Sequence, residues 1–174
     1  MTATPKGMLV GMTDRSVPVI RRGRPEDHDA VVALDIRSFE PHTSPGQPIT
    51  VASNFFERVP AEQHFMAWLD DHLVGYVRMG HPTPLPSNAH VVEIQGLAVD
   101  PAARGRGVGA MLVRAVLDDA EQRHMRKVSL RVMGSNPTAQ RLYQRMGFEV
   151  QGHLRDEFLI NGEYVDDLMM ARFV

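Results

Sequence analysis

The sequence predicts a mixed α/β domain, and three features of the chain support this fold class. Short apolar runs typical of β-strands alternate with longer segments whose apolar residues recur at the spacing of an α-helix. A Gly-rich segment, residues 104–109, lies between a strand-like run and a helix-like one. The last two strand-like runs are joined at Asn161–Gly162, a dipeptide typical of tight β-hairpins.

The N-terminal half is expected to begin with a tail and then to form short elements. Residues 1–17 show no periodicity, so we expect a flexible tail followed by a single domain over residues 18–174. A strand is predicted at 19–21 and a helix from Pro25, because Glu26 and Asp27 would suit the helix dipole in its first turn. Residues 41–48 are expected to form a loop, and residues 53–59 a short second helix. Residues 65–69 and 73–79 are predicted to pair as a hairpin.

The C-terminal half alternates longer strands and helices. A Pro-rich loop at 82–86 precedes a predicted strand at 91–99, a helix at 107–124, a strand at 128–133 and a helix at 137–146. The helix at 107–124 is amphipathic, because Leu112 and Val116 lie opposite Arg114 and Asp118. Residues 148–174 are expected to form the final hairpin.

Composition narrows the possible functions. The 174 residues carry a formal charge of −2, which gives no reason to expect nucleic acid or an anionic membrane as a partner. Cysteine is absent, which excludes disulfides, thiolate metal sites and an acyl-cysteine intermediate. No apolar run approaches the roughly 18 residues of a membrane helix, and the first residues lack a signal-peptide core, so a cytoplasmic location is expected.

The Gly-rich segment predicts a phosphate-binding loop at the start of a helix. Glycine at 105, 107 and 109 lets the backbone approach a ligand closely, and amides at a helix N-terminus attract an anion such as pyrophosphate. The spacing is GxGxG and not the GxGxxG of dinucleotide-binding folds, and the strand at 128–133 lacks the acid that would hold a ribose. No Gly-Lys-Ser/Thr follows, so a nucleoside triphosphate loop is not expected.

A second segment, residues 136–148, has the signature of a short capped helix. Asn136 suits the N-cap, Pro137 the first helical position and Gly147 a left-handed C-terminal cap. An apolar stripe includes Leu142 and Tyr143, so this pattern alone predicts that Tyr143 is a core residue.

Together, the two segments resemble the GCN5-related N-acetyltransferase (GNAT) family. The family's loop pattern, Gln/Arg-x-x-Gly-x-Gly/Ala, is matched by Arg104, Gly107 and Gly109. The downstream Asn-x-x-Ala-x-x-x-Tyr with a trailing Gly-Phe is matched by Asn136, Ala139, Tyr143, Gly147 and Phe148. The resemblance implies a mixed, mostly antiparallel central sheet that is splayed between two parallel strands and flanked by helices.

The resemblance also implies a binding site for acetyl-CoA as co-substrate, without a metal. Pantetheine would lie along the backbone of residues 97–99, the pyrophosphate would bind the backbone of 104–109, and Asn136 would contact the pantetheine arm. The Tyr143 hydroxyl would lie near the thioester sulfur and stabilise it by a hydrogen bond as the sulfur gains charge. The implied donor-site residues are Leu97, Ala98, Val99, Arg104, Gly105, Arg106, Gly107, Val108, Gly109, Asn136 and Tyr143.

Glu93 is the candidate general base, since its position resembles that of the catalytic glutamate in histone acetyltransferases of the family. Strand alternation predicts that Glu93 shares a face with Leu97 and Val99, about 13 Å or more away, so a relaying water is expected. The alternative is a structural carboxylate. Ribosomal-protein N-acetyltransferases carry a glutamate on the following strand where this chain has Arg131, which argues against their particular base and substrate.

The acceptor site is expected in residues 39–58 and 156–167, which would cover the thioester end. Phe55 and Phe56 would form an apolar patch of a movable lid, and Asp156 and Glu157 would favour a cationic amine. Alternatively, the two phenylalanines would only anchor the core, and the two acids would only add solubilising charge.

These expectations converge on direct transfer of an acetyl group from acetyl-CoA to an amine, in a ternary complex. A small primary amine and a protein or peptide N-terminus both stay open as acceptors, and so does a homodimer. Two other functions stay open: an acyl-CoA-binding module without turnover, and a transferase that uses another donor such as succinyl-CoA. The eight histidines show no metal-ligand spacing, and Ser135 has no evident His/Asp partners, so neither a metal nor a serine nucleophile is expected.

Overall fold

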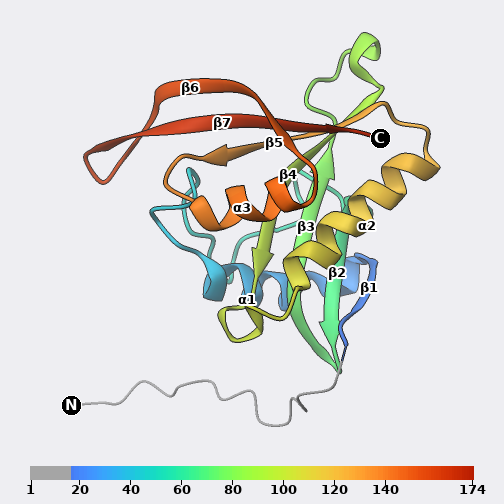
Figure 1. Ribbon diagram of the computed structural model, residues 1–174. Helices are drawn as coiled ribbons and strands as arrows, with labels where there is room; N and C mark the ends of the chain where they lie inside the picture. The colour runs from blue at the N-terminus through green and yellow to red at the C-terminus, as the bar shows by residue number, and fades with distance from the viewer. Residues whose placement is uncertain (1–16) are drawn as a thin grey trace.

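The chain forms one seven-stranded mixed sheet with helices on both faces (Figure 1). The computed structural model describes residues 17–174, so the tail expected at 1–17 lies outside the described residues except for its last residue. The strand order is β1-β2-β3-β4-β5-β7-β6, and only the β4–β5 pair is parallel. This arrangement confirms the expected fold class.

The observed elements follow the predicted order. The strands are β1 Val19–Arg22, β2 His64–Leu69, β3 His72–Gly80, β4 Val91–Val99, β5 Lys127–Met133, β6 Glu149–Ile160 and β7 Glu163–Phe173. The helices are α1 His28–Ser38, α2 Val108–Gln122 and α3 Pro137–Arg145. Short 3-10 turns lie at Pro25–Asp27, Ala61–Gln63, Pro86–Asn88 and Pro101–Ala103, so the expected first helix begins as a 3-10 turn and becomes α-helical at His28.

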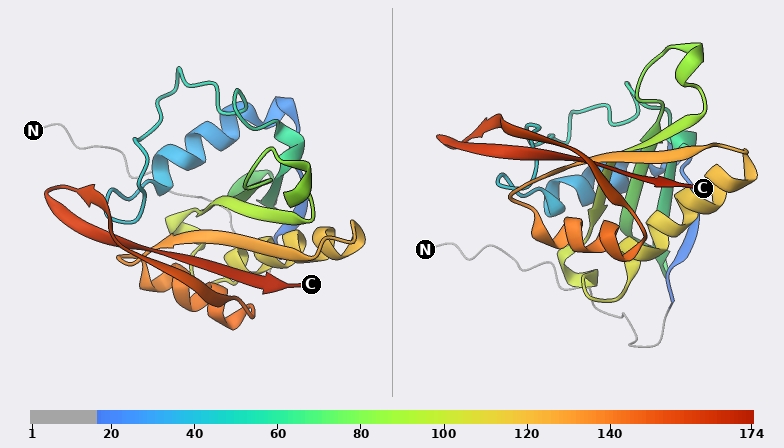
Figure 2. Two further views of the ribbon diagram at one scale, coloured as in Figure 1. Left: turned by 90° about the horizontal axis from the view of Figure 1, so that it is seen from above. Right: turned by 45° about the horizontal axis from the view of Figure 1, so that its top comes forward.

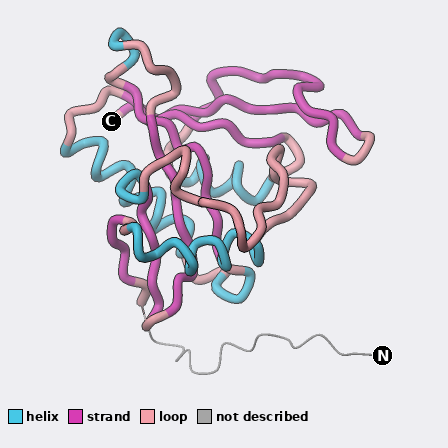
Figure 3. The backbone as a smooth tube through the Cα atoms, turned by 180° about the vertical axis from the view of Figure 1, so that it is seen from behind, coloured by secondary structure: helices cyan, strands magenta, loops and turns pink. Residues whose placement is uncertain are grey.

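Two apolar clusters hold the helices on opposite faces of the sheet. Helix α1 and the long segment after it cover one face, and α2 with α3 covers the other (Figures 2 and 3). The larger cluster lies under α2 and α3, where Leu112, Val116 and Leu117 are fully buried. The smaller cluster joins Val31 and Leu34 of α1 to the sheet. We call these faces the α2 face and the α1 face.

Strands β4 and β5 pair over only part of their length and then diverge. Their parallel register runs from Val91 to Ile94 on β4 and from Lys127 to Leu130 on β5. Beyond that point β4 stays paired with β3 alone and β5 with β7, and the two strands separate, as Figure 1 shows. The sheet therefore opens into a splay next to the C-terminal half of β4.

A β-bulge lies in β4 at the start of this splay. Met79 of β3 pairs with Ile94 and Arg78 pairs with Gly96, so Gln95 is an extra residue on β4. A bulge of this kind shifts the alternation of side chains by one position.

This shift overturns one sequence expectation. Ile94 contributes to the cluster on the α2 face before the bulge, whereas Leu97 and Val99 pack there after it, and Ala98 packs on the α1 face. Glu93, which alternates with Ile94, therefore faces the α1 side and does not share a face with Leu97 and Val99. The prediction failed because a bulge is a tertiary feature that simple alternation does not reveal.

The helix expected at residues 53–59 is also wrong, since this stretch forms turns and bends. Phe55 and Phe56 both pack against the buried ring of His64, with ring centroids 5.5 and 5.4 Å from it. Consecutive residues of a helix point about 100° apart, so a helix could not direct both rings at one partner. Tertiary packing therefore decides the conformation here.

Candidate active site

The Gly-rich loop presents backbone amides at the N-terminus of α2. Gly105 and Gly107 have φ angles of 77° and 80°, in the left-handed region that side chains disfavour, and open space surrounds the position a Cβ would take on each. Gly107 is the N-cap of α2, and its carbonyl accepts the first helical hydrogen bond from Met111 N–H at 3.0 Å. The amides of the first turn have no carbonyl acceptor within the helix, so they can donate to an anion such as pyrophosphate.

Gly109 serves a different purpose from the other two glycines. A Cβ at this position would lie 3.1 Å from Leu142 Cδ2 of α3 and close to Val99 of β4. The missing side chain lets α2 pack tightly against α3 beside the splay. The family-like spacing of the loop thus combines two left-handed glycines with one packing glycine.

Two side chains that the sequence analysis missed hold the turn between β4 and the loop. Asp100 is buried; its Oδ2 accepts hydrogen bonds from Arg37 Nε and Nη2 at 3.1 and 2.9 Å, and its Oδ1 accepts from Ala102 N–H. Asp100 before Pro101 has the sequence of a turn cap, but its partner on α1 lies 63 residues away. The Asp-Pro turn is a local signal that could have marked Asp100, whereas no local signal marks its ion pair with Arg37.

Helix α3 has the caps that were predicted for it, and Tyr143 lies on its buried side. Asn136 Oδ1 accepts a hydrogen bond from Ala139 N–H at 3.0 Å, and Gly147 ends the helix with a φ of 83°. Tyr143 is 6% exposed and packs edge-on against Phe148 at 5.7 Å. Burial raises the pKa of its hydroxyl well above the ordinary value, so the phenol stays protonated.

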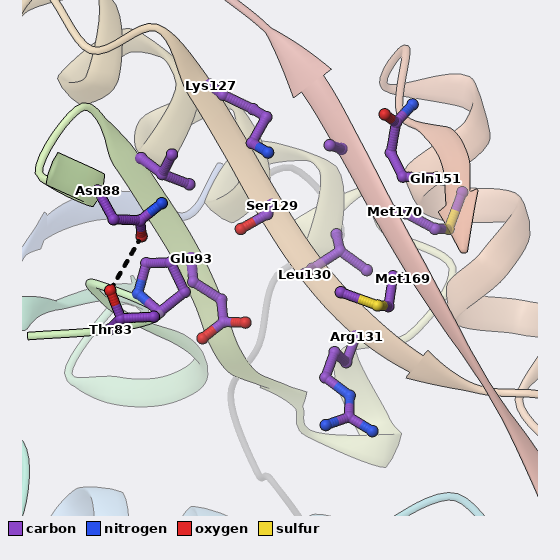
Figure 4. Close-up of a pocket in the computed structure, with 13 residues that line it drawn as sticks. Thr83, Asn88, Glu93, Lys127, Ser129, Leu130, Arg131, Gln151, Met169 and Met170 are labelled. Atoms are coloured by element: carbon purple, nitrogen blue, oxygen red, sulfur yellow. Dashed lines mark hydrogen bonds between the residues drawn. The ribbon is translucent and has the colours of Figure 1, made fainter. Parts of the chain in front are cut away.

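Glu93 lies in a shallow hollow of about 220 Å³ on the α1 side of β4 and β5. Figure 4 shows Glu93, Ser129 and Arg131 lining this hollow, with the Thr83–Asn88 pair at one edge. Desolvation raises the pKa of the Glu93 carboxyl above its ordinary value, although a hydrogen bond with Gln95 and the charge of Arg131 oppose the rise. The hollow adjoins the splay, because Glu93 is two residues from the bulge.

The final hairpin reaches this site through Arg131. The Arg131 guanidinium binds Asp167, which is buried, and Glu157, whose Oε1 lies 2.8 Å from Nη2. Glu157 is thus engaged by a cation of the protein itself. Asp156 has an exposed side chain and a positive φ, and its N–H donates to Asp166 Oδ1 at 2.9 Å. The structure brings Glu157 to Arg131, which lines the hollow, and leaves the side chain of Asp156 exposed.

Residues 39–58, here called the strap, join the two sides of the splay. Glu40 forms an ion pair of 2.6 Å with Arg104, which follows β4, and the carbonyl of His42 accepts a hydrogen bond from Ser135 Oγ, which follows β5. Farther along the strap, Phe55 packs edge-on against Tyr76 at 5.2 Å on the α1 face. The strap therefore lies over the splay from the side opposite α2 and α3.

No group of three His, Asp or Glu side chains within residues 17–174 is arranged to hold a metal ion. No helix between residues 17 and 174 is long and apolar enough to cross a membrane.

Comparison with known proteins gives the splay and its loop a family context. The sequence model described as "Acetyltransferase (GNAT) family" matches residues 29–148, which include the loop, the splay and α3. The chain belongs to this family. It is therefore an acetyl-CoA-dependent N-acetyltransferase that transfers acetyl groups to amines.

Individual relatives agree with this assignment. The chain is 31% identical over 114 residues to an L-amino acid N-acetyltransferase of Escherichia coli, covering 65% of this GNAT chain and 69% of the relative. A structure of the protein smu.2055 from Streptococcus mutans UA159 superposes with a TM-score of 0.80 and 29% identity, over 89% of this chain and 98% of that one. A Sinorhizobium meliloti phosphinothricin acetyltransferase, solved with acetyl-CoA, shares the fold with a TM-score of 0.79 and 19% identity, covering 90% and 88%.

Proposed function

We propose that the acetyl group passes directly from acetyl-CoA to an amine that reaches the splay from the α1 side. The observation that carries this proposal is the divergence of β4 from β5 beside the left-handed glycines of the α2 N-terminus. The loop amides would hold the pyrophosphate, and pantetheine would lie along residues 97–99 in the gap. The thioester would then meet the α1 side near the bulge, where the strap covers the opening.

Proton transfer in this proposal depends on Glu93 and Tyr143. A primary amine of pKa near 10.4 must lose a proton before it attacks, and the half-buried Glu93 would accept that proton through a water. The amine nitrogen forms a bond to the acetyl carbon, and the carbon–sulfur bond breaks to release the thiolate of CoA. Tyr143 would donate a hydrogen bond to this thiolate. Its raised pKa opposes full proton transfer to sulfur, so stabilisation by the hydrogen bond is its main contribution.

Substitution of Tyr143 by phenylalanine tests the proposed role of its hydroxyl. Tyr143→Phe keeps the packing against Phe148, so the melting temperature should stay within a few degrees. We expect kcat for CoA release to fall about 10–100-fold. The measurement is thiol release from acetyl-CoA with a panel of primary amines. An unchanged kcat would leave Tyr143 as a core residue only.

The same assay also tests the choice of acyl donor. In competition between acetyl-CoA and succinyl-CoA, acetyl-CoA should be the donor that is used. Dependence on acetyl-CoA supports a cytoplasmic location for the enzyme.

Neutralising Asp156 and Glu157 should change the KM of the amine and leave acetyl-CoA affinity within about threefold, if these acids help to select the acceptor.

A further inference from the structure

Arg78 on β3 is a half-buried cation that has no carboxylate partner in the described part of the chain. Its Nη2 donates a hydrogen bond of 3.1 Å to the carbonyl oxygen of Gln95, at the β4 bulge. Its Nε is buried and has no hydrogen-bond partner. Within residues 17–174, no carboxylate oxygen lies within 4 Å of the Arg78 guanidinium. A partly desolvated guanidinium is normally balanced by an anion, so the lack of a carboxylate beside Arg78 is unusual.

The guanidinium of Arg78 lies on the α1 face at the mouth of the splay. A Cβ on Gly96 would be 3.7 Å from Nη2 and 3.8 Å from Nε, so the charge lies over the first residue after the bulge. Arg78 is in register with His64 of β2 and lies two residues beyond Tyr76, which packs on the α1 face. This is the side from which the acceptor amine is proposed to approach.

Neighbouring groups do not neutralise Arg78. The ring of His64 is fully buried, and desolvation, with a further contribution from the charge of Arg78, lowers its pKa to about 4, so it is neutral near pH 7. Asp35, the nearby acid on α1, accepts the hydroxyl of Tyr76. Two cations of the described chain line the hollow. Arg131 already binds Asp167 and Glu157, and Lys127 lies opposite Val91, at the paired end of β4 and β5 and away from the bulge. Within residues 17–174, Arg78 is thus the cation beside the bulge that is placed to bind an external anion.

We propose that Arg78 binds a carboxylate of the acceptor, so that the substrate class is an amine that carries a carboxylate near its nitrogen, as in an amino acid. A guanidinium presents parallel N–H groups that match a carboxylate, and the pair would be strong at this partly desolvated position. The carboxylate would anchor the acceptor over Gly96 and direct its amine toward the thioester. This inference rests on the proposed function, since it names the acceptor for the same site.

The test compares acceptors that differ only in the carboxylate. Thiol release from acetyl-CoA is measured for a panel of L-amino acids, for the matching carboxamides and for the matching decarboxylated amines. We expect kcat/KM for the preferred amino acid to exceed that of its carboxamide by at least about tenfold. Arg78→Gln should lower kcat/KM for the amino acid about 10–100-fold and change the carboxamide by less than about threefold. Arg78→Lys should recover part of the loss.

The controls separate this inference from the proposed function. Arg24→Gln removes an exposed arginine near β1 and should leave the preference for the carboxylate intact. Equal or better turnover of the carboxamides by the unmodified enzyme would overturn the inference while leaving acetyl transfer to amines in place. Absence of thiol release with every amine would instead contradict the proposed function. If Arg78→Gln fails to fold, as judged by its melting curve, the comparison of acceptors on the unmodified enzyme decides alone.

Discussion

At the scale of single residues, burial changes the acid–base behaviour of the two proposed catalytic side chains in the same direction. Desolvation raises the pKa of both Glu93 and Tyr143, and in each case it favours the protonated form. For Tyr143 this maintains a hydrogen-bond donor at neutral pH. For Glu93 it makes the carboxylate a stronger base than an exposed glutamate, which suits a group that must accept a proton from an ammonium ion.

Replacing Glu93 by glutamine should remove one ionisation from the pH profile. The pKa of Glu93 is raised above the ordinary value of 4.5. The active carboxylate therefore forms as the pH rises through this raised pKa, and kcat/KM should increase over the same range. Glu93→Gln should lose this lower rise and keep the higher one that belongs to the amine acceptor. The measurement is kcat/KM from about pH 4 to 10 with one amine. A variant with the parent's rate and profile would return Glu93 to a structural role.

Residue roles were predictable from sequence where the evidence was local. The cap formed by Asn136 and the burial of Tyr143 follow from spacing within one short helix, and the structure confirms both. The Arg37–Asp100 ion pair and the hydrogen bond of Arg78 to the Gln95 carbonyl depend on contacts between distant parts of the chain. No local pattern marks such residues, so the sequence analysis did not name them.

At the scale of elements, strands and hairpins were the most predictable features and the irregular ones the least. A hairpin is encoded locally, by alternating apolar and polar residues in its two strands and by turn residues between them. This is why the β2–β3 and β6–β7 hairpins were predicted correctly. The absent helix at 53–59 and the bulge at Gln95 both arise from packing between elements. The loop and the capped helix of the proposed donor side were predicted well as structural elements, because each is local in sequence.

The Gly-rich loop allows a matched test of its role in binding. Gly107→Glu would place a negative charge and added bulk where the pyrophosphate is expected, so calorimetric binding of acetyl-CoA should be lost. Gly162→Glu is the control, because Gly162 has a φ of 85° and the same open surroundings but lies at the tip of the final hairpin. Both variants incur similar backbone strain, and the control should bind acetyl-CoA with unchanged affinity. Unchanged binding by Gly107→Glu would contradict the loop assignment.

At the scale of the whole molecule, the strap joins parts of the chain that follow the two diverging strands. Its contacts with Arg104 and Ser135 lie across the opening through which the acceptor is proposed to enter. The pair between Glu40 and Arg104 is solvent-exposed, so it contributes at most about 1 kcal/mol to the free energy of unfolding. Its effect is therefore expected in the motion of the strap more than in global stability.

Removing both strap contacts should loosen the strap without unfolding the sheet. In the double variant Glu40→Gln, Ser135→Ala, we expect faster amide hydrogen exchange in residues 39–58 and unchanged exchange in β2 and β3. The KM of the amine should rise while acetyl-CoA affinity stays within about threefold. Glu26→Gln, which removes an exposed ion pair with Arg24, is the control. Exchange in the strap equal to that of the parent would show that these two contacts do not restrain it.

The extra residue at Gln95 has a consequence for how this chain can change in length. Upstream of it, the odd-numbered side chains of β4 face the α1 side, where the acceptor is proposed to enter, and downstream of it they pack toward α2. This one residue therefore determines the face of the sheet on which each side chain lies. Deleting that residue would turn Leu97 and Val99 toward the acceptor while leaving Glu93 in place. Insertions and deletions among relatives are therefore expected in loops such as residues 81–90. Between residues 93 and 99, by contrast, the number of residues should stay constant, because it decides which side chains face the proposed acceptor site.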